Sequence, residues 1–132
     1  MTVFISQPMT GLNETDIIEQ RGEAAEQIKK IYGDKVEICD SYHTDIEREH
    51  IASTYLYDSP NRDVYWLGRS IETLCWADLI WFTDGWENSR GCKIENMVAS
   101  LYGIEKSFPT DGIRIKMSEL ITKDNVIQAK EY

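Results

Sequence analysis

The sequence predicts an α/β fold, a three-layer sandwich with a four- or five-stranded, mainly parallel sheet. Short apolar runs without polar alternation predict strands that are buried on both faces. Segments with helical spacing lie between these runs, and strands that alternate with helices form parallel βαβ units. The 132 residues suffice for one hydrophobic core and are too few for two, so we expect a single domain over residues 1–132.

The expected strands are short and strongly apolar. The first is TVFIS at residues 2–6, the second is KVEIC at 35–39, and the third is DLIWFT at 78–83. A late edge strand is expected at GIRIKM, residues 112–117. Residues 109–132 would then form a tail, or this edge strand followed by a final helix.

Helical spacing predicts helices over residues 14–32, 62–77 and 89–102, the first with Asn13 as its N-cap. Residues 40–61 are irregular and charged, which predicts a long, partly helical excursion that could cover a site. The residues expected to face the core are Ile17, Ala24, Ile28 and Ile31 in the first helix, and Val64, Leu67, Ile71 and Leu74 in the second.

Charge and cysteine content argue against several classes of function. A net charge of -9 leaves no basic surface for a nucleic acid polymer or an anionic membrane. No apolar run reaches the length of a membrane span, and the N-terminus shows no signal peptide. Three widely spaced cysteines without a C-x-x-C pair predict neither a disulfide framework nor zinc. We therefore expect a reduced, cytoplasmic protein.

Glu95 is the acid that most needs an explanation. At about 100° per residue it lies roughly 60° from the centre of the expected core stripe of its helix, which is Ile94, Val98 and Leu101. One interpretation is a carboxylate that faces a pocket and acts as nucleophile or base at an anomeric carbon. The other is a boundary glutamate paired with Lys93 or with an arginine. The spacing favours neither.

The loop before Glu95 has the composition of an anion site. Asn88 and Ser89 can cap the helix, Arg90 supplies a positive charge, and Gly91 allows close approach of a ligand. Such a helix start can bind a phosphate monoester. The same four residues are also common as capping residues without a ligand.

Two loops are expected to converge at one edge of the sheet, because the carboxyl ends of parallel strands meet there. After the third strand, Asp84 could hold a ribose hydroxyl, Gly85 forms the turn, and Trp86 could stack on a base; each is also explained by a turn and by packing. After the first strand, the candidate ligand contacts are Ser6, Met9, Thr10 and Gly11.

A third group of residues favours contact between protein chains. Tyr65, Trp66 and Trp76 are expected to form an aromatic surface, which oligomer contact explains more easily than a ligand does. An interaction protein that works through this surface is therefore a further hypothesis.

PMTGL at residues 8–12 and GWENSRGCKIE at 85–95, the latter after an Ala-Asp pair and an apolar run, resemble the nucleoside 2-deoxyribosyltransferase-like superfamily. The similarity covers residues 2 to about 108 and is strongest to small bacterial and phage members. It implies a flavodoxin-like sandwich that forms a homodimer or a higher homo-oligomer. It also implies cleavage or transfer at the N-glycosidic bond of a (deoxy)nucleoside or its 5′-monophosphate, without metal or cofactor.

The resemblance assigns roles to individual residues. Glu95 matches the nucleophilic glutamate of the family, and Ser89 matches a serine that contacts phosphate in the nucleotide hydrolase branch. The loop from Ser6 to Gly11 matches the loop that holds sugar and phosphate. These matches predict either an N-glycosidic bond hydrolase or a deoxyribosyltransferase.

Three positions depart from the family pattern. Relatives carry a tyrosine where this chain has Phe4, often an aspartate where it has Ser70, and a glycine where it has Gln7. Phenylalanine cannot donate a hydrogen bond to a carboxylate, and serine is not an acid. A catalytically impaired module that binds or senses a nucleotide in the same pocket is therefore the alternative prediction.

Overall fold

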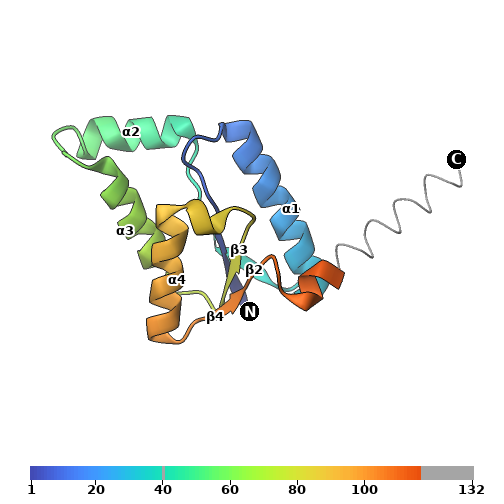
Figure 1. The fold of residues 1–132 in the computed structure, drawn as a ribbon. Helices are drawn as coiled ribbons and strands as arrows, with labels where there is room; N and C mark the ends of the chain where they lie inside the picture. The colour runs from blue at the N-terminus through green and yellow to red at the C-terminus, as the bar shows by residue number, and fades with distance from the viewer. Residues whose placement is uncertain (40, 117–132) are drawn as a thin grey trace, which may run out of the picture.

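The computed structural model describes residues 1–39 and 41–116, and within them the protein is an α/β sandwich with a four-stranded, all-parallel sheet (Figure 1). The strand order is β2-β1-β3-β4. The strands are β1 (Thr2–Ser6), β2 (Glu37–Cys39), β3 (Leu79–Phe82) and β4 (Glu105–Ser107). This arrangement is consistent with a flavodoxin-like three-layer sandwich and confirms the predicted fold class.

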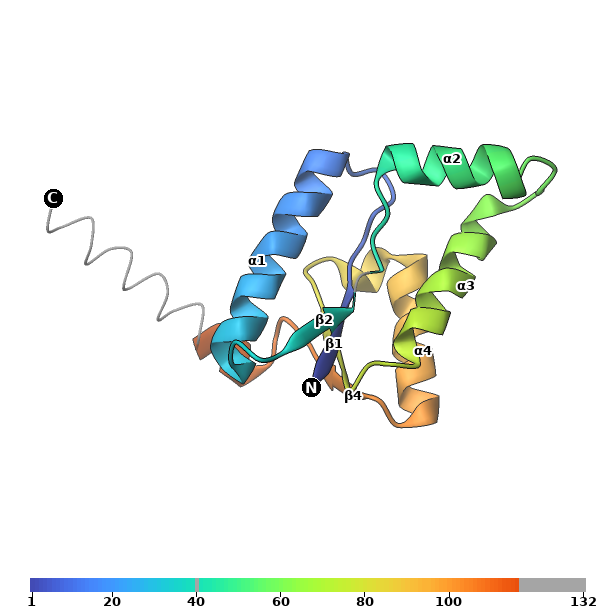
Figure 2. The same ribbon diagram turned by 180° about the vertical axis from the view of Figure 1, so that it is seen from behind.

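The two faces of the sheet carry separate apolar clusters, which define the three layers (Figures 1 and 2). Alternate residues of β1 point to opposite faces, so Val3 packs toward α1 (Glu14–Tyr32) while Phe4 packs toward α4 (Arg90–Tyr102). On the α1 side, Ala24 and Ile28 are buried against the sheet, as the helical spacing predicted.

Side chains cap the helices where the sequence indicated. Asn13 accepts a hydrogen bond from the Asp16 amide at the start of α1, and Ser89 accepts one from the Cys92 amide at the start of α4. Gly103 ends α4 in the left-handed conformation, with φ of 73°. In the part of the chain that the structure describes, no helix is both long enough and apolar enough to span a membrane.

The excursion after β2 contains α2 (Asp45–Tyr55) and leads to α3 (Arg62–Leu74). In both views α2 crosses the end of the molecule between α1 and α3 (Figures 1 and 2). Its start is tied to α1 because Glu14 accepts hydrogen bonds from the Tyr42 hydroxyl and from the Asp45 amide, each at 3.1 Å. The predicted partly helical excursion is thus a helix that carries the chain to the wall formed by α3.

The edge strand predicted at residues 112–117 is wrong for the described part of that range. Residues 112–116 are helical, and the fourth strand is β4. In a half-buried strand the isoleucines of GIRIKM would be buried and the arginine exposed. Here Ile113 and Ile115 are exposed, while Arg114 between them is 7% exposed. The final helix predicted after residue 117 lies outside the described residues.

Arg114 joins the helical residues 112–116 to the sheet. Its guanidinium donates hydrogen bonds to the carbonyl oxygens of Phe82 and Ser107, at 2.8 and 3.1 Å, and lies 3.6 Å from the centre of the Trp81 ring. Burial lowers its pKa to about 10. The Arg114 side chain therefore links the carboxyl ends of β3 and β4 by hydrogen bonds. It does so on the face of the sheet that carries Trp81.

We predict that Arg114→Met lowers the free energy of unfolding by roughly 2–4 kcal/mol, because two buried carbonyl oxygens lose a charged donor. Urea unfolding measures this. Lys116→Met is the matched control, since Lys116 is exposed in the same helical segment. Equal effects of the two substitutions would contradict the structural role of Arg114.

Candidate active site

Glu95 lies at the centre of the buried face of α4, not beside it. The buried residues of this helix are Cys92, Glu95 and Ala99. The stripe predicted from the sequence is wrong at Ile94 and Leu101, which are 38% and 74% exposed. Small side chains at Cys92 and Ala99 allow the helix to approach the sheet closely, and this rotates the larger apolar residues outward. The predicted homo-oligomer, for which such exposed residues are candidates, stays a prediction.

The Glu95 carboxylate is held by the last residue of β1. It is 6% exposed, and its Oε1 accepts a hydrogen bond of 2.7 Å from the Ser6 hydroxyl, which is fully buried. Burial raises the pKa of Glu95 to about 7, although the Ser6 hydrogen bond and the Arg21 charge both act to lower it. These contacts favour a pocket carboxylate over a boundary glutamate paired with Lys93.

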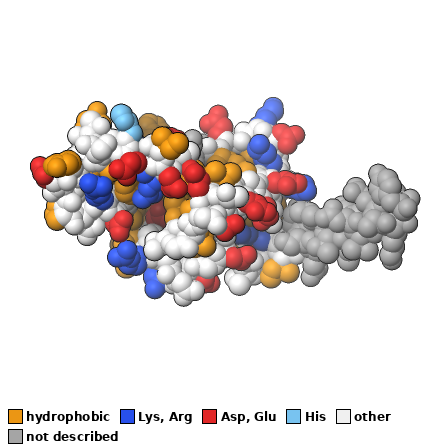
Figure 3. Space-filling view, turned by 90° about the horizontal axis from the view of Figure 1, so that it is seen from above, with side chains coloured by type: hydrophobic (Ala, Val, Ile, Leu, Met, Phe, Trp, Pro, Cys, Tyr) orange, Lys and Arg blue, Asp and Glu red, His pale blue; other side chains and the backbone are white. Residues whose placement is uncertain are grey.

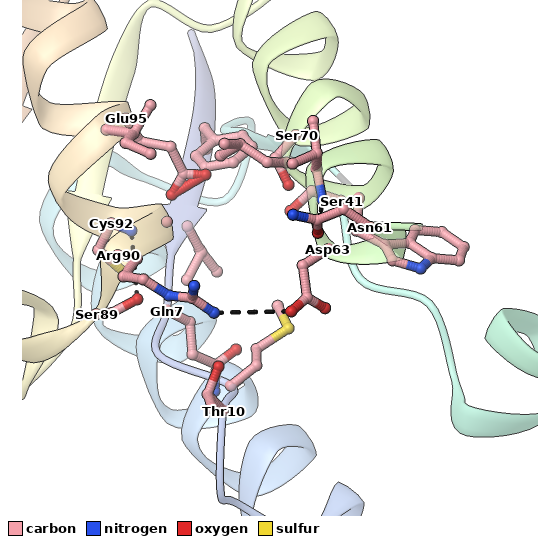
Figure 4. Close-up of a pocket in the computed structure, with 18 residues that line it drawn as sticks. Gln7, Thr10, Ser41, Asn61, Asp63, Ser70, Ser89, Arg90, Cys92 and Glu95 are labelled. Atoms are coloured by element: carbon pink, nitrogen blue, oxygen red, sulfur yellow. Dashed lines mark hydrogen bonds and ion pairs between the residues drawn. The ribbon is translucent and has the colours of Figure 1, made fainter. Parts of the chain in front are cut away.

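A cavity of about 300 Å³ opens in front of Glu95 (Figure 4). Its walls come from β1, from the loops after β1 and β2, from α3 with the residue before it, and from the start of α4. The lining residues are Phe4, Ile5, Gln7, Met9, Thr10, Ser41, Asn61, Asp63, Val64, Trp66, Leu67, Ser70, Ser89, Arg90, Gly91, Cys92, Ile94 and Glu95. This volume is at the lower end of the range of small-molecule sites, roughly 300–1,000 Å³.

The structure brings together about half of the residues that the sequence singled out. Those that line the cavity are Met9, Thr10, Ser89, Arg90, Gly91 and Glu95. Ser6 does not line the cavity, but its hydroxyl donates a hydrogen bond to the Glu95 carboxylate. The cavity lining does not include Gly11, Asp84, Gly85, Trp86 or Asn88.

The turn after β3 has a packing function in this structure. Trp86 lies against Phe82 and Phe108, with ring centres 5.0 and 5.1 Å away, so the packing interpretation of this tryptophan fits better than base stacking. Gly85 takes a left-handed conformation, with φ of 84°, which begins the short 3-10 helix at Trp86–Asn88. The chain then reaches Ser89, the cap of α4.

The wall opposite Glu95 comes from α3. The sequence singled out Ser70 in this wall only through the family resemblance, and it did not predict Asn61 or Asp63. Asn61, Asp63 and Ser70 reach the cavity from this side (Figure 4). Asp63 and Ser70 are seven residues apart, with Leu67 between them, so helical spacing places all three on one face. That spacing was visible in the sequence, but the sequence does not show that this face looks toward α4.

Trp66, one of the three residues of the predicted aromatic surface, is also part of the cavity wall. It lines the cavity, and the Arg48 guanidinium lies 4.7 Å from its ring centre. Tyr65 packs edge-on against it, whereas Trp76, beyond the end of α3, is 76% exposed. Tyr65 and Trp66 therefore form a contacting pair, and the predicted interaction surface stays a prediction.

The loop after β1 is fixed to α1 by Gln7. The Gln7 amide nitrogen donates to the Ile17 carbonyl at 2.8 Å and to Gln20 at 2.9 Å, and its oxygen accepts from Arg21 at 3.4 Å. These bonds hold the backbone that carries Met9 and Thr10 at the cavity. Gln7 thus has a structural role in this fold.

Compared with models of protein families, with curated proteins and with solved structures, the chain matches none of them. The chemistry of the cavity therefore rests on its own groups. A carboxylate that titrates near neutral pH can attack an electrophilic carbon or exchange a proton, and the Arg90 guanidinium, which lines the same cavity, can bind an anion.

We predict that Glu95→Gln changes the pH dependence of stability. A raised pKa in the folded state means that protonation of Glu95 contributes stability below its ordinary value of 4.5, and this contribution is lost as the pH rises through about 7. The unfolding free energy of the variant minus that of the wild type should therefore grow by about 3 kcal/mol between pH 4.5 and 8.

Denaturant titrations across this pH range measure the difference. The matched control is Glu87→Gln, which removes an exposed carboxylate just before α4. A difference between Glu95→Gln and wild type that stays constant over the range would contradict a buried carboxylate that titrates near neutral pH.

Proposed function

We propose that the protein cleaves or transfers the N-glycosidic bond of a (deoxy)nucleoside or its 5′-monophosphate, with Glu95 as the nucleophile. The observation that carries the proposal is a buried carboxylate, held by Ser6, at the inner end of a small-molecule cavity. The position of the cavity is a second support. It lies at the carboxyl end of β1, where the strand order reverses, and open parallel sheets commonly bind ligands there.

In the proposed reaction the ionised Glu95 attacks C1′ of the sugar. A bond forms between the carboxylate oxygen and C1′ as the bond from C1′ to the base nitrogen breaks, and its electron pair leaves with the base, which takes up a proton. Water then releases the sugar, or a second base accepts it. Where the ligand carries a phosphate, Ser89, Arg90 and the amides at the start of α4 are its proposed contacts.

Ser6 offers a substitute for the tyrosine that Phe4 replaces. Phe4 and Ser6 are two residues apart on β1 and point to the same face of the sheet. Phe4 lines the cavity without a donor, while the Ser6 hydroxyl donates directly to Glu95. The missing tyrosine therefore does not leave the carboxylate without an orienting hydrogen bond.

Glu95→Gln is predicted to reduce base release by roughly 10³-fold, because an amide is a poor nucleophile at C1′. The assay incubates the protein with mixed nucleosides and monophosphates and measures free base by chromatography. Glu87→Gln serves as the control and should retain the wild-type rate. Full turnover by Glu95→Gln would exclude Glu95 as nucleophile.

Ser6→Ala should move the rise of activity with pH to higher values and lower kcat more than it raises KM. The Ser6 hydrogen bond stabilises the ionised form of Glu95, and without it the pKa of this carboxylate rises further. Thr83→Val is the control, because the Thr83 hydroxyl is buried at the same sheet edge but donates to the Ser6 carbonyl. Identical pH profiles for wild type and Ser6→Ala would refute the positioning role of Ser6.

The second candidate function is a nucleotide-binding or sensing module without turnover. Ser70 favours it, because this residue reaches the cavity opposite Glu95 where relatives often place an acid, and the wall therefore lacks a second carboxylate at that position. Thermal stabilisation by a nucleoside or nucleotide without base release would support this candidate. Absence of stabilisation by any nucleoside or nucleotide would count against both candidates.

A further inference from the structure

An ion pair crosses the cavity between its two helical walls. The Arg90 Nη2 atom lies 3.6 Å from the Asp63 Oδ2 atom, so the pair joins the first turn of α4 to the first turn of α3 (Figure 4). Both residues line the cavity. Their side chains are 82% and 76% exposed, which leaves them open to solvent and to an entering ligand.

The charges of the cavity lining are few and nearly balanced. Among the lining residues the charged side chains are Asp63, Arg90 and Glu95. When Glu95 is protonated, these charges sum to zero, and when it is ionised, they sum to one negative charge. A phosphate that approaches Arg90 therefore meets a carboxylate already paired with the same guanidinium.

The charge of Asp63 has a larger expected effect on ligand binding than on the stability of the fold. An exposed ion pair contributes little to stability, about 0–1 kcal/mol, so Asp63 is not explained as a structural brace. Its charge matters more to a ligand. Two unit charges about 4 Å apart interact by about 1 kcal/mol even in bulk water, and a phosphate monoester carries nearly two negative charges. Other cations lie nearby, but Arg21 contacts Gln7 and Arg48 lies over Trp66.

We propose that Asp63 sets the charge specificity of the cavity, by occupying Arg90 and so favouring an uncharged nucleoside over its 5′-monophosphate. This inference rests on the proposed function and narrows its substrate class. Arg90 remains the anion contact of the cavity, but Asp63 weakens it. The site then recognises the hydroxyl groups and the base of its ligand, and a phosphate on the ligand weakens binding.

The test measures binding at equilibrium, in low salt, where screening is weakest. The probes are inorganic phosphate, ribose 5-phosphate and ribose, none of which has a base that the protein could release. Failure of the base-release assay therefore leaves this test intact. Wild type, Asp63→Asn, Arg90→Gln and the double variant are compared by calorimetric titration.

Asp63→Asn is expected to bind inorganic phosphate and ribose 5-phosphate about tenfold more tightly than wild type, which corresponds to about 1.4 kcal/mol. Ribose should bind equally to both. The gain should disappear in the double variant, because it requires the Arg90 guanidinium. Glu87→Gln removes an exposed negative charge close to α4 but outside the cavity lining, and it should show no gain.

Three results would overturn the proposal. The first is equal phosphate affinity in wild type and Asp63→Asn, including no detectable phosphate binding by any of the proteins. The second is an equal gain in Glu87→Gln, which would indicate a general effect of net charge. The third is a gain that persists without Arg90.

Discussion

The hydrogen bond from Ser6 to Glu95 is the interaction on which the rest of the site depends. A carboxylate this deeply buried is costly unless a donor or a proton compensates it. Here Ser6, the last residue of β1, supplies the donor. The pKa of Glu95, about 7, means that the carboxyl group is protonated below neutral pH. The same bond fixes the rotation of α4, because Glu95 can reach Ser6 only when the small residues Cys92 and Ala99 face the sheet.

The strand order makes this contact possible between distant parts of the chain. Ser6 and Glu95 are 89 residues apart, yet β1 and β3 are neighbours, and the loop after β3 delivers the start of α4 to the end of β1. Packing of Trp86 against Phe82 and Phe108 shapes that loop. The acid is therefore positioned by the hydrophobic layer behind it, on the face of the sheet that α3 and α4 cover (Figures 1 and 2). On the surface seen from above, acidic and basic side chains are interspersed (Figure 3).

The sequence predicted the parts of the fold that depend on local patterns. The buried strands β1 and β3, the caps Asn13 and Ser89, and the strand–loop–helix segment that carries Glu95 all follow from spacing and capping chemistry, whereas β4 was not predicted. It failed where tertiary packing overrides periodicity. Ile94 and Leu101 look like core residues, but the narrow gap under α4 accepts Cys92 and Ala99 instead.

Two further failures have the same origin. The isoleucines around Arg114 resemble a strand, but the guanidinium finds two carbonyl oxygens and an aromatic face, and the segment turns into a helix. Asp63 was missed because its role at the cavity follows only when α3 is placed opposite α4, and Ser70 was singled out only through the family resemblance. Helical spacing shows which residues share one face of α3. It does not show that this face lies opposite α4, because that depends on how the chain runs through α2.

The two walls of the cavity are therefore held in place by different parts of the fold. The half that bears Glu95 rests on the sheet and on Gln7, which is bonded to α1. The half that bears Asp63 is the first part of α3, which packs on the core through Ile71 and Leu74 near its other end. The helix before it, α2, has Ala52 as its buried residue, and its start is tied to α1 by Glu14. Substitutions of the exposed Asn61 and Asp63 at the start of α3 therefore disturb little core packing. The acid and its support can thus stay constant while the opposite wall diversifies, so that one scaffold can acquire new ligands without rebuilding its reactive centre.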